Sequence, residues 1–276
     1  MLPLISATAL RDLLSGPAAP VVLDCSFDLA DPAAGERSYH EGHLPNAHYV
    51  HLDRGLSGPK TGHNGRHPLR ERAQYAQWMG QCGIAPGRLV VVCDRQGGMY
   101  AARAWWVLRW MGHAAVALLD GGVPAWVQAG GSLTRELPPK APTAPYPQQA
   151  PALPTFDAGQ LQLRLADVLV IDARAPERYR GEVEPLDAVA GHIPGAINRF
   201  FKDNLQDDGR FKPAEQLRAE FSPLLDGRQV VHQCGSGVTA CHNLLAMELA
   251  GLGTTALYPG SWSEWSSDPS RPMARR

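Results

Sequence analysis

The sequence predicts an α/β protein made of two similar domains in tandem, each a small parallel sheet with helices on both faces. Its 276 residues suggest about two domains at roughly 150 residues each. Short apolar segments of strand length alternate with helical stretches, which is the pattern of α/β domains. Three segments of the first half also recur in the second half, which indicates an internal duplication.

The duplication is visible in three pairs of segments. They are VVLDCSFD (21–28) with VLVIDARA (168–175), EGHLPNAHYVHLD (41–53) with AGHIPGAINRFFKD (190–203), and residues 89–126 with residues 229–265. His43 matches His192 at an offset of 149 residues, whereas Gly98 matches Gly237 at an offset of 139. The first copy therefore carries ten more residues between these segments, and we place this insertion in RGLSGPKTGHNGRHP (54–68).

A proline-rich segment separates the two copies, with seven prolines in residues 138–154. Proline fixes φ and has no backbone donor, so this segment is expected to be an extended, semi-rigid connector. We therefore predict an N-terminal domain over residues 1–137, a linker over 138–154 and a C-terminal domain over 155–276.

Within each copy, continuous apolar runs predict strands that are buried on both faces of a parallel sheet. These runs are 21–24 and 90–93 in the first copy, and 168–172 and 230–233 in the second. Ser6 is suited to cap the first helix. The stretches 101–111 and 239–250 have helical composition, and each is followed by a glycine suited to end a helix, Gly112 and Gly251.

Charge and hydropathy exclude several classes of protein. Lys and Arg number 26 and Asp and Glu number 27, so the formal net charge is −1. A protein that coats DNA or an anionic membrane needs a basic excess, so we expect neither nucleic acid nor membrane as a partner. No run of about eighteen apolar residues is present, which argues against a membrane-spanning helix.

Cysteine usage bears on the compartment. The five cysteines are an odd number and are widely spaced, in a chain too long to need disulfides for stability, so reduced thiols are expected. The first sixteen residues lack a basic leader ahead of an apolar run and a small-residue cleavage site, so they do not indicate secretion. We therefore expect a cytoplasmic protein.

The segment with the clearest chemical signal is VVHQCGSGVTA (230–240). A strand ends, a Gly-Ser-Gly turn follows and a helix begins, so Cys234 lies at the carboxyl end of a parallel strand, where α/β folds bind ligands. Backbone amides of the turn and of the first helical turn can point at the sulfur there and stabilise its thiolate. We interpret Cys234 as a nucleophile, which requires that it can be reached from solvent.

A buried structural cysteine before a helix is the alternative interpretation. Two other enzyme classes fit the segment less well. A loop-cysteine phosphatase needs an arginine that closes the loop on phosphate, but Thr239 and Ala240 stand at the fifth and sixth positions after Cys234. A serine hydrolase needs G-x-S-x-G, which residues 235–237 do not supply. In the first copy Arg95 matches Cys234, so only the second copy can use this nucleophile.

The tandem α/β repeat, the Gly-His-Leu/Ile-Pro segments, the CGSGVTAC loop and the GSWSEW segment (260–265) together resemble the two-domain rhodanese superfamily. Within it, the chain is most similar to the 3-mercaptopyruvate sulfurtransferases. The resemblance implies an enzyme that moves sulfur from 3-mercaptopyruvate to a thiol acceptor, such as thioredoxin or a small thiol, or to cyanide. The sulfur would pass through a persulfide on Cys234, with release of pyruvate and without a cofactor.

The loop composition separates two donors. Thiosulfate-using relatives carry two basic residues directly after the cysteine, whereas this chain has Gly235 and Ser236. Thiosulfate is a compact dianion that basic loop side chains would help to bind. 3-Mercaptopyruvate carries its carboxylate away from the transferred sulfur, and its leaving enolate must gain a proton. A small loop with a hydroxyl group fits the second donor better.

The resemblance also implies which residues form the site. The proton-handling Asp–His–Ser set of the family maps onto Asp53, His67 and Ser236, and His67 belongs to the insertion of the first copy. The donor site is expected to be lined by the loop residues Gly235, Gly237, Val238 and Thr239.

Arginines are expected to bind the carboxylate of the donor. The arginine of the family that has this role maps onto Arg178. A second arginine, common in eukaryotic members, falls near Leu186 and Asp187 here and is missing. Arg199 is a candidate replacement for it.

Other histidines, aspartates and tryptophans are interpreted as structural. His43 and His192 occur in both copies, and Asp24 and Asp172 each end a strand as turn or cap residues. Six histidines fall between positions 40 and 67, but their spacings do not match a metal site, so we predict no metal. Six tryptophans are expected to pack in the core, namely Trp105, Trp106, Trp110, Trp126, Trp262 and Trp265.

Two other functions stay open at the level of sequence. One is a thiosulfate sulfurtransferase on the same scaffold, which would transfer sulfur from thiosulfate to cyanide. The other, from a different class, is a non-catalytic sulfur-relay or partner-binding module.

Overall fold

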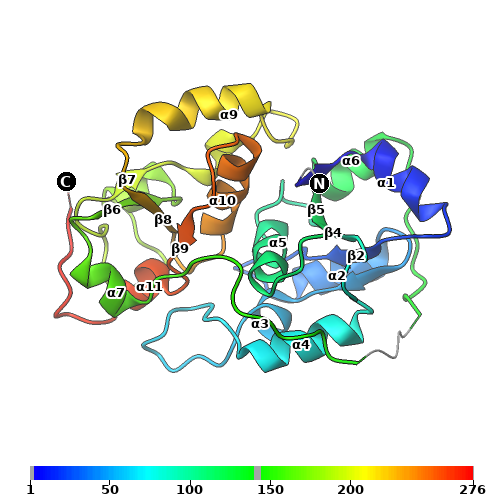
Figure 1. Ribbon diagram of the computed structural model, residues 1–276, viewed down its shortest axis with the longest axis horizontal. Coiled ribbons are helices and arrows are strands. Elements are labelled where there is room, and N and C mark those ends of the chain that lie inside the picture. The colour runs from blue at the N-terminus through cyan, green and yellow to red at the C-terminus, as the bar shows by residue number, and fades with distance from the viewer. Residues whose placement is uncertain (1–2, 140–143, 276) are drawn as a thin grey trace. The chain divides into compact units, whose positions relative to one another are not determined.

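The computed structural model describes residues 3–139 and 144–275, and these form two compact units (Figure 1). The first unit comprises the described residues of 1–57, 70–152 and 207–211. The second comprises those of 58–69, 153–206 and 212–276. Residues 140–143 of the predicted linker lie outside the described residues. The predicted insertion therefore contributes residues 58–69 to the second unit.

The first unit holds a five-stranded sheet in the order β1-β5-β4-β2-β3, with every pair parallel. Its strands are β1 (Leu4–Ile5), β2 (Val21–Asp24), β3 (Ala47–Tyr49), β4 (Val90–Cys93) and β5 (Val116–Leu119). Its helices are α1 (Ala7–Leu14), α2 (Ala34–Glu41), α3 (Leu52–Gly55), α4 (Arg72–Gln81), α5 (Ala101–Trp110) and α6 (Gly122–Gln128). Ser6 caps α1 as predicted, because its hydroxyl accepts a hydrogen bond from the Ala9 N–H at 3.2 Å.

The second unit holds a four-stranded parallel sheet in the order β7-β6-β8-β9. Its strands are β6 (Val168–Asp172), β7 (Ile197–Asn198), β8 (Gln229–Gln233) and β9 (Ala256–Leu257). Its helices are α7 (Ala158–Leu163), α8 (Pro176–Tyr179), α9 (Ala214–Phe221), α10 (Ala240–Leu249) and α11 (Ser261–Trp265), with 3₁₀ turns at Phe201–Asn204 and Ser222–Leu224. Helices flank the sheet in each unit, so the predicted fold class is confirmed (Figure 1).

The predicted strands are the centres of the two cores. All residues of β2, β4, β5 and β6 are buried, as expected for strands covered on both faces of a parallel sheet. The six tryptophans predicted to pack are all buried. Trp262 and Trp265 of α11 belong to the core cluster of the second unit, and Trp126 of α6 belongs to that of the first. The repeated aromatic positions therefore serve packing.

Equivalent strands of the two sheets show which residues correspond. Asp24 pairs with Cys93 between β2 and β4, and Asp172 pairs with Gln233 between β6 and β8. The next residue in the first unit is Asp94, and this residue is therefore the counterpart of Cys234.

Backbone hydrogen bonds from α6 and α11 support the same correspondence between Asp94 and Cys234. The Val123 N–H donates to the Asp94 carbonyl at 2.9 Å, as the Trp262 N–H donates to the Cys234 carbonyl at 3.0 Å. The sequence match to Arg95 was wrong by one position, because the first loop is one residue longer before its shared glycine.

The carboxylate of Asp94 is held by main-chain donors. It accepts four hydrogen bonds of 2.8–2.9 Å, from the N–H groups of Gln96, Gly98, Tyr100 and Ala101. Burial raises the pKa of Asp94, and these four amides act in the opposite direction. The loop that follows the central strand in this fold is thus an anion cradle, and the first unit fills it with a carboxylate.

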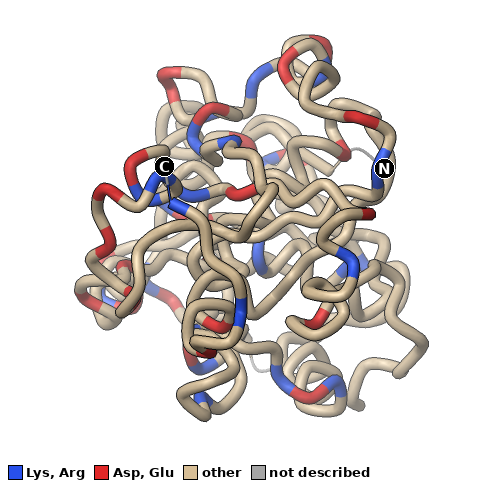
Figure 2. The backbone as a smooth tube through the Cα atoms, turned by 90° about the vertical axis from the view of Figure 1, so that its left-hand side faces the viewer, with Lys and Arg blue, Asp and Glu red and all other residues tan. Residues whose placement is uncertain are grey.

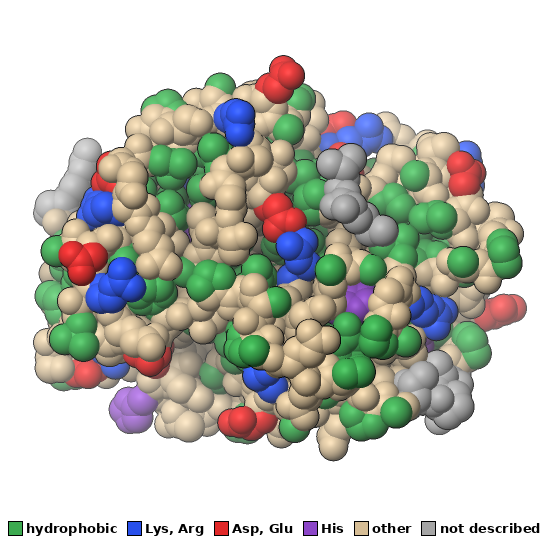
Figure 3. Space-filling view, in the orientation of Figure 1, with side chains coloured by type: hydrophobic (Ala, Val, Ile, Leu, Met, Phe, Trp, Pro, Cys, Tyr) green, Lys and Arg blue, Asp and Glu red, His purple; other side chains and the backbone are tan. Residues whose placement is uncertain are grey.

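The charged groups show no segregation by sign along the tube. In Figure 2 basic and acidic residues are interspersed in both units, and both signs also occur on the face drawn in Figure 3. Of the helices within residues 3–139 and 144–275, none has the length and apolar character that crossing a membrane requires.

We predict that Asp94→Ala lowers the free energy of unfolding by about 2–4 kcal/mol, because four buried amides lose their acceptor. Urea unfolding followed by far-UV circular dichroism measures the change. Asp12→Ala, at an exposed position of α1, is the matched control and is expected to change stability by about 0.5 kcal/mol or less. Asp94→Asn keeps one acceptor oxygen and should recover part of the loss. Equal effects of the two alanine variants would contradict the cradle.

Candidate active site

Cys234 follows β8 directly and precedes the turn that leads into α10. Its backbone is fixed to α11: its N–H donates to Ser261 Oγ at 3.1 Å, and its carbonyl accepts from the Trp262 N–H at 3.0 Å. The residue is only 2 % exposed, which is less than we expected for a nucleophile. Access from solvent, which the interpretation of Cys234 as a nucleophile requires, is therefore narrow, and that interpretation stays a prediction.

The two loop glycines have different structural reasons. Gly237 has φ +74°, and a Cβ added there would lie 2.2 Å from the Pro259 carbonyl oxygen, so only glycine fits. At Gly235 the space of a Cβ is limited by side-chain nitrogens, with Arg66 Nη2 at 2.8 Å and Arg178 Nη1 at 3.4 Å. The absence of a side chain at residue 235 lets two guanidinium groups approach the cysteine loop.

Val238 and Thr239 complete the turn. The Val238 carbonyl accepts from the Cys241 N–H, and the Thr239 carbonyl accepts from the His242 N–H, each at 3.1 Å. Both residues thus shape the start of α10 through their main chain. Their predicted contact with a donor stays a prediction.

The insertion carries His67 to Ser236. His67 Nδ1 lies 2.7 Å from Ser236 Oγ, and both residues are buried, with exposures of 4 % and 6 %. A histidine that shares a hydrogen bond with a serine hydroxyl can take up or return its proton. Two of the three predicted proton-handling residues therefore lie together beside the cysteine loop.

The insertion is anchored within the second unit at several points. The Gly58 N–H donates to the Pro68 carbonyl at 2.8 Å and closes the base of the loop. Gly65 adopts φ +82°, and a Cβ there would lie 2.8 Å from the Gly260 carbonyl oxygen. The Arg66 N–H donates to Ser263 Oγ at 3.0 Å, and the Ser263 N–H donates to the Gly235 carbonyl at 2.9 Å. One serine therefore links the insertion to the cysteine loop.

Asp53 lies in α3 of the first unit. Its backbone N–H donates to His51 Nδ1 at 3.1 Å, in the N-terminal turn of that helix. Its predicted association with His67 stays a prediction from the sequence.

Arginines and acids form an ion-pair cluster beside the cysteine loop. Arg178 Nη2 donates to Glu184 at 2.6 Å and lies 3.5 Å from a carboxylate oxygen of Asp187. Arg66 Nη1 also pairs with Asp187, so this one carboxylate spans two guanidinium groups. Arg66 was not among the residues predicted from the sequence, where only its position next to His67 could have drawn attention to it.

Arg174, in the segment between β6 and α8, makes structural contacts. Arg174 pairs with Asp172 at 2.6 Å and donates to the Gly191 carbonyl at 2.7 Å, and its guanidinium carbon lies 4.9 Å from the centre of the Trp262 ring. Asp172 thus has the role of an ion-pair partner at the end of its strand. The contact between Arg174 and Trp262 connects the segment before α8 to α11.

Arg199 is engaged elsewhere in the second unit. It donates to Glu220 at 2.6 Å and to Asn204 Oδ1 at 3.1 Å, and it lies over the Phe221 ring at 4.8 Å. These contacts give the guanidinium a structural explanation. Its predicted part in donor binding stays a prediction.

The two conserved-looking histidines of the repeat have the same surroundings. His43 Nδ1 lies 2.8 Å from the Tyr39 carbonyl oxygen, and the imidazole ring of His43 stacks on the ring of Tyr39. His192 makes the same two contacts with Tyr179. A shared arrangement in both units agrees with the structural interpretation. No group of three or more His, Cys, Asp or Glu residues within the part of the chain that the structure describes could hold a metal ion.

Three of the other cysteines have raised pKa values and are poor nucleophiles, because the thiolate is the reactive form. Burial raises the pKa of Cys82 to about 12 and that of Cys25 and Cys93 well above the usual value. All five cysteines are free thiols in the structure. Cys93 lies in the core of β4, as predicted.

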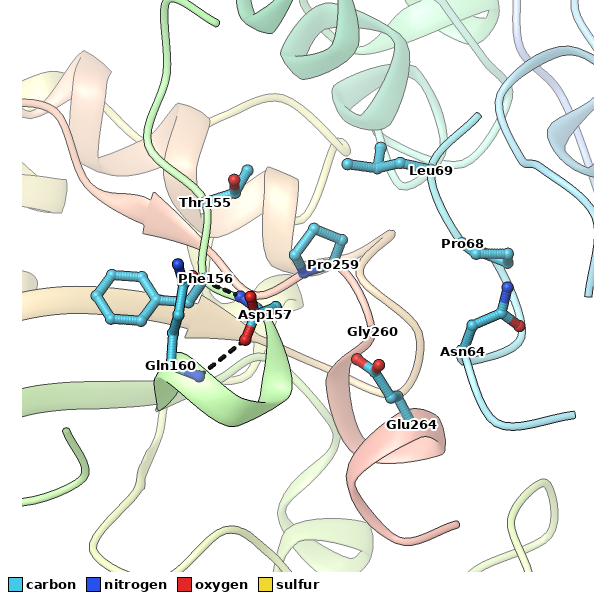
Figure 4. Close-up of a pocket in the computed structure, with 10 residues that line it drawn as sticks. All are labelled: Asn64, Pro68, Leu69, Thr155, Phe156, Asp157, Gln160, Pro259, Gly260 and Glu264. Carbon is cyan, nitrogen blue, oxygen red and sulfur yellow. Dashed lines mark hydrogen bonds between the residues drawn. The ribbon is translucent and has the colours of Figure 1, made fainter. Parts of the chain in front are cut away.

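A cavity of about 380 Å³ is lined in part by the insertion (Figure 4). Asn64, Pro68 and Leu69 line it from the insertion, and Pro259 and Gly260 line it from the segment before α11. Figure 4 shows Asp157 bonded to Gln160 at the start of α7, at the opposite side of the cavity from Asn64. None of the site residues predicted from the sequence is among the residues that line this cavity.

Comparison with known proteins identifies relatives over nearly the whole chain. The model of the rhodanese-like domain matches twice, at residues 6–129 and 157–268. A Pseudomonas aeruginosa protein named "Probable 3-mercaptopyruvate sulfurtransferase" is 49 % identical over 98 % of this chain and 97 % of its own. The thiosulfate sulfurtransferase of Rattus norvegicus is 34 % identical over 88 % of this chain and 84 % of its own. The solved 3-mercaptopyruvate sulfurtransferase from Leishmania major superposes with a TM-score of 0.83 at 28 % identity, over 93 % of this chain and 72 % of that one.

The cluster around Arg199 generates a prediction on pH. Burial alone would raise the pKa of Glu220, but hydrogen bonds from Lys212, Arg199 and Gln216 outweigh it and lower the pKa to about 2. A carboxylate with a lowered pKa stabilises the fold above its unfolded pKa, and this contribution is lost as the pH falls through the folded pKa. Because Glu220 is partly exposed, we expect roughly 1 kcal/mol or less at neutral pH.

Glu220→Gln is therefore expected to lower the unfolding free energy at pH 7, and its difference from the parent chain should shrink between pH 4.5 and pH 2. Urea unfolding at a series of pH values measures this. Glu215→Gln, at an exposed position of the same helix, is the control. A difference that stays constant across this pH range would show that Glu220 contributes no charge-dependent stability.

Proposed function

The chain belongs to the rhodanese-like domain family, and we propose that it is a 3-mercaptopyruvate sulfurtransferase that carries the transferred sulfur as a persulfide on Cys234. The 2.7 Å contact between His67 and Ser236, two residues from Cys234, is the observation that supports this donor most directly. A serine hydroxyl that shares a hydrogen bond with a histidine can supply the proton that a leaving carbanion needs. The named relatives in both donor groups support sulfur transfer as the reaction.

In the first half-reaction the Cys234 thiolate attacks the sulfur of 3-mercaptopyruvate. The new S–S bond forms as the C–S bond breaks, and the electron pair of the C–S bond stays on carbon as the enolate of pyruvate. The proton of the donor thiol, or one supplied by Ser236, ends on that carbon. The products are pyruvate and a Cys234 persulfide, and no external oxidant or reductant is required.

The remaining predicted residues, apart from Arg199, each have a proposed part in this step. Backbone amides around Gly235, Gly237, Val238 and Thr239 stabilise the anionic sulfur, by analogy with the four amides that hold Asp94 in the first unit. Arg178 binds the carboxylate of the donor. Asp53 orients His67 and stabilises its protonated form.

In the second half-reaction the outer sulfur passes to an acceptor. We propose a thiol of thioredoxin or of a small molecule, or cyanide, as the acceptor, and the cytoplasm as the compartment. The five cysteines are an odd number and are widely spaced, a pattern that supports a reducing compartment more than a disulfide framework. The alternative from a different functional class is a non-catalytic sulfur-relay or partner-binding module, which does not turn over small sulfur donors. This alternative predicts that the Cys234→Ser variant binds its partner protein with unchanged affinity.

Thiosulfate is the second candidate donor. The specific observation in its favour is that Arg66 and Arg178 approach Gly235, where cations could also bind a dianion. The loop itself, however, has Gly235 and Ser236 where thiosulfate-using relatives have basic residues. A higher kcat/KM with thiosulfate than with 3-mercaptopyruvate would reverse our assignment.

We predict that 3-mercaptopyruvate without acceptor adds one sulfur atom to the protein, and that peptide mapping places it on Cys234. Intact-mass spectrometry measures the gain, and pyruvate is quantified in the same sample. Cys241→Ser, seven residues further in α10, is the matched control and should still be loaded. Release of pyruvate without sulfur on Cys234 would exclude the persulfide mechanism.

We predict that Ser236→Ala lowers turnover with 3-mercaptopyruvate roughly 100-fold, and lowers turnover with thiosulfate much less, because only the first donor leaves as a carbanion that must be protonated. Steady-state kinetics with both donors and one acceptor measure the two ratios. Ser263→Ala is a control for loop structure, since its hydroxyl holds the Arg66 backbone. Equal losses on both donors would remove Ser236 from the proton path.

A further inference from the structure

The cavity of Figure 4 has no part in the proposed reaction, and all of its lining residues belong to the second unit. Its volume of about 380 Å³ falls in the range of small-molecule sites. Three segments supply its walls, namely the insertion (64–69), the residues before and at the start of α7 (155–160), and the start of α11 (259–264). A bound molecule would therefore touch the insertion that carries His67 and two helices of the unit at the same time.

Two polar walls of this cavity are held in place by the protein itself. Asn64 accepts a hydrogen bond from the Thr61 N–H at 2.9 Å and donates to the Pro59 carbonyl at 3.0 Å. Asp157 and Gln160 form a reciprocal pair of hydrogen bonds, of 3.0 and 2.8 Å, at the start of α7. The cavity is thus preformed, and a ligand would have to order few of its side chains.

Glu264 brings a carboxylate to the cavity from α11. In Figure 4 it lies between Asp157 of the α7 side and Asn64 of the insertion. A Cβ added to Gly260 would overlap Glu264 Oε2, so the carboxylate packs against the bare main chain of that glycine. Any side chain at residue 260 would force this carboxylate out of its place.

The lining carries two negative charges. The acids are Asp157 and Glu264, and among the described residues that line the cavity none is Lys, Arg or His. Burial raises the pKa of Glu264, although Tyr258 and Arg271 offset part of this rise. The carboxylate of Asp157 raises it further, and Arg271 itself pairs with Asp268 at 3.7 Å. A cation in the cavity would therefore stabilise two carboxylates that repel each other.

Much of the remaining lining is apolar, and it comes from Pro68, Leu69, Phe156 and Pro259. Arg164 lies over the Phe156 ring, 5.4 Å from its centre, but is not among the residues that line the cavity. A metal ion would make no use of these apolar walls, and within the described ranges no group of three or more His, Cys, Asp or Glu residues could hold one. Two acids beside apolar walls suit an organic cation with an apolar body.

We propose that this cavity binds a small organic ammonium ion, with its charged end at Asp157 and Glu264 and its apolar body against the insertion and Phe156. Two carboxylates on different helices suit an ammonium group, whose three donors point in different directions. A planar guanidinium, by contrast, pairs its fork of donors with one carboxylate. The bound ion joins the insertion to α7 and α11. Its binding requires no sulfur transfer and is tested on the resting protein.

A purely structural Glu264 would leave the cavity filled with water and without preference for a charged ligand. Two probes of nearly the same shape separate the two roles, because phenethylammonium carries a positive charge and phenethyl alcohol is neutral. Isothermal titration calorimetry of the complete chain at neutral pH measures the Kd of each probe.

We predict that phenethylammonium binds with a Kd of about 1 mM or tighter, and that phenethyl alcohol binds at least roughly 10-fold more weakly. Glu264→Gln keeps the size of the side chain and should weaken binding of the ammonium ion roughly 10-fold. Asp157→Asn keeps the helix cap and should weaken it roughly 2- to 5-fold, since Asp157 is exposed. Glu215→Gln and Asp167→Asn, at exposed positions of the same unit outside the cavity lining, are the matched controls and should bind as the parent chain does.

Covalent coupling locates the bound amine. A water-soluble carbodiimide activates a carboxyl group, the primary amine of the probe attacks the activated carbon, and an amide forms as the carbodiimide leaves with one carboxyl oxygen as a urea. Peptide mapping should find this amide mainly on Glu264 or Asp157, at a level that saturates with the probe. Coupling to the exposed Glu215 should rise in proportion to the probe concentration without saturation.

Four results would overturn the proposal. They are no binding of phenethylammonium at roughly 10 mM, equal affinity for the two probes, a loss in Glu264→Gln no larger than in Glu215→Gln, and amides spread evenly over the exposed acids. If Glu264→Gln does not fold, Asp157→Asn and the coupling pattern still decide. Because none of these measurements depends on sulfur loading of Cys234, a failure of the proposed function and a failure of this site are distinguishable.

Discussion

In the first unit, main-chain amides converge after β4, the central strand of the parallel sheet, and the structure of this loop depends on them. In the first unit this loop holds the Asp94 carboxylate through four N–H groups, which offset part of the cost of burying a charge. In the second unit the equivalent residue is Cys234. In the proposed function, the equivalent loop of the second unit stabilises a nucleophilic sulfur, where the first unit holds a carboxylate that fixes structure.

The insertion explains how a duplicated fold acquired a single reactive site. Residues 58–69 interrupt the first copy in sequence but pack within the second unit. They contribute His67 at Ser236 and Arg66 at Gly235, and Ser263 fixes them to the helix that also anchors Cys234. The cysteine loop has small residues at 235 and 236 because these positions receive side chains from another segment. A loop with larger side chains would exclude them.

Much of the fold could be predicted from the sequence, because buried parallel strands are short apolar runs and the repeat doubles the signal. At the candidate site, the structure brings His67 and Ser236 together, as the resemblance implied, whereas the chemical role of Cys234 stays a prediction. The sequence comparison matched Cys234 with Arg95, which is one residue too far. A one-residue gap can be placed at several positions of a glycine-rich loop, so the sequence alone does not fix the match. The register of the sheet does fix it, because it identifies Asp94 as the residue that corresponds to Cys234. Arg66 could not be found, since an arginine in a polar loop gives no sign of the ion pairs that will orient it. Arg199 was a candidate for donor binding, but the sequence gives no sign that it pairs with Asn204, 5 residues away, and with Glu220, 21 residues away.

The near-complete burial of Cys234 and the two adjacent cations act on the same choice of donor. In the proposed function, a cysteine residue that is 2 % exposed admits only a small reactant, and desolvation makes charge recognition beside it stronger than it would be in water. A donor whose carboxylate is a few bonds from its sulfur can place the first on the guanidiniums and the second on the cysteine. An uncharged thiol of the same size would have to displace water from the cations without replacing its hydrogen bonds, which disfavours it. In the proposed function, selectivity for such a donor comes from the guanidinium of Arg178, which lies against Gly235, the residue that follows Cys234.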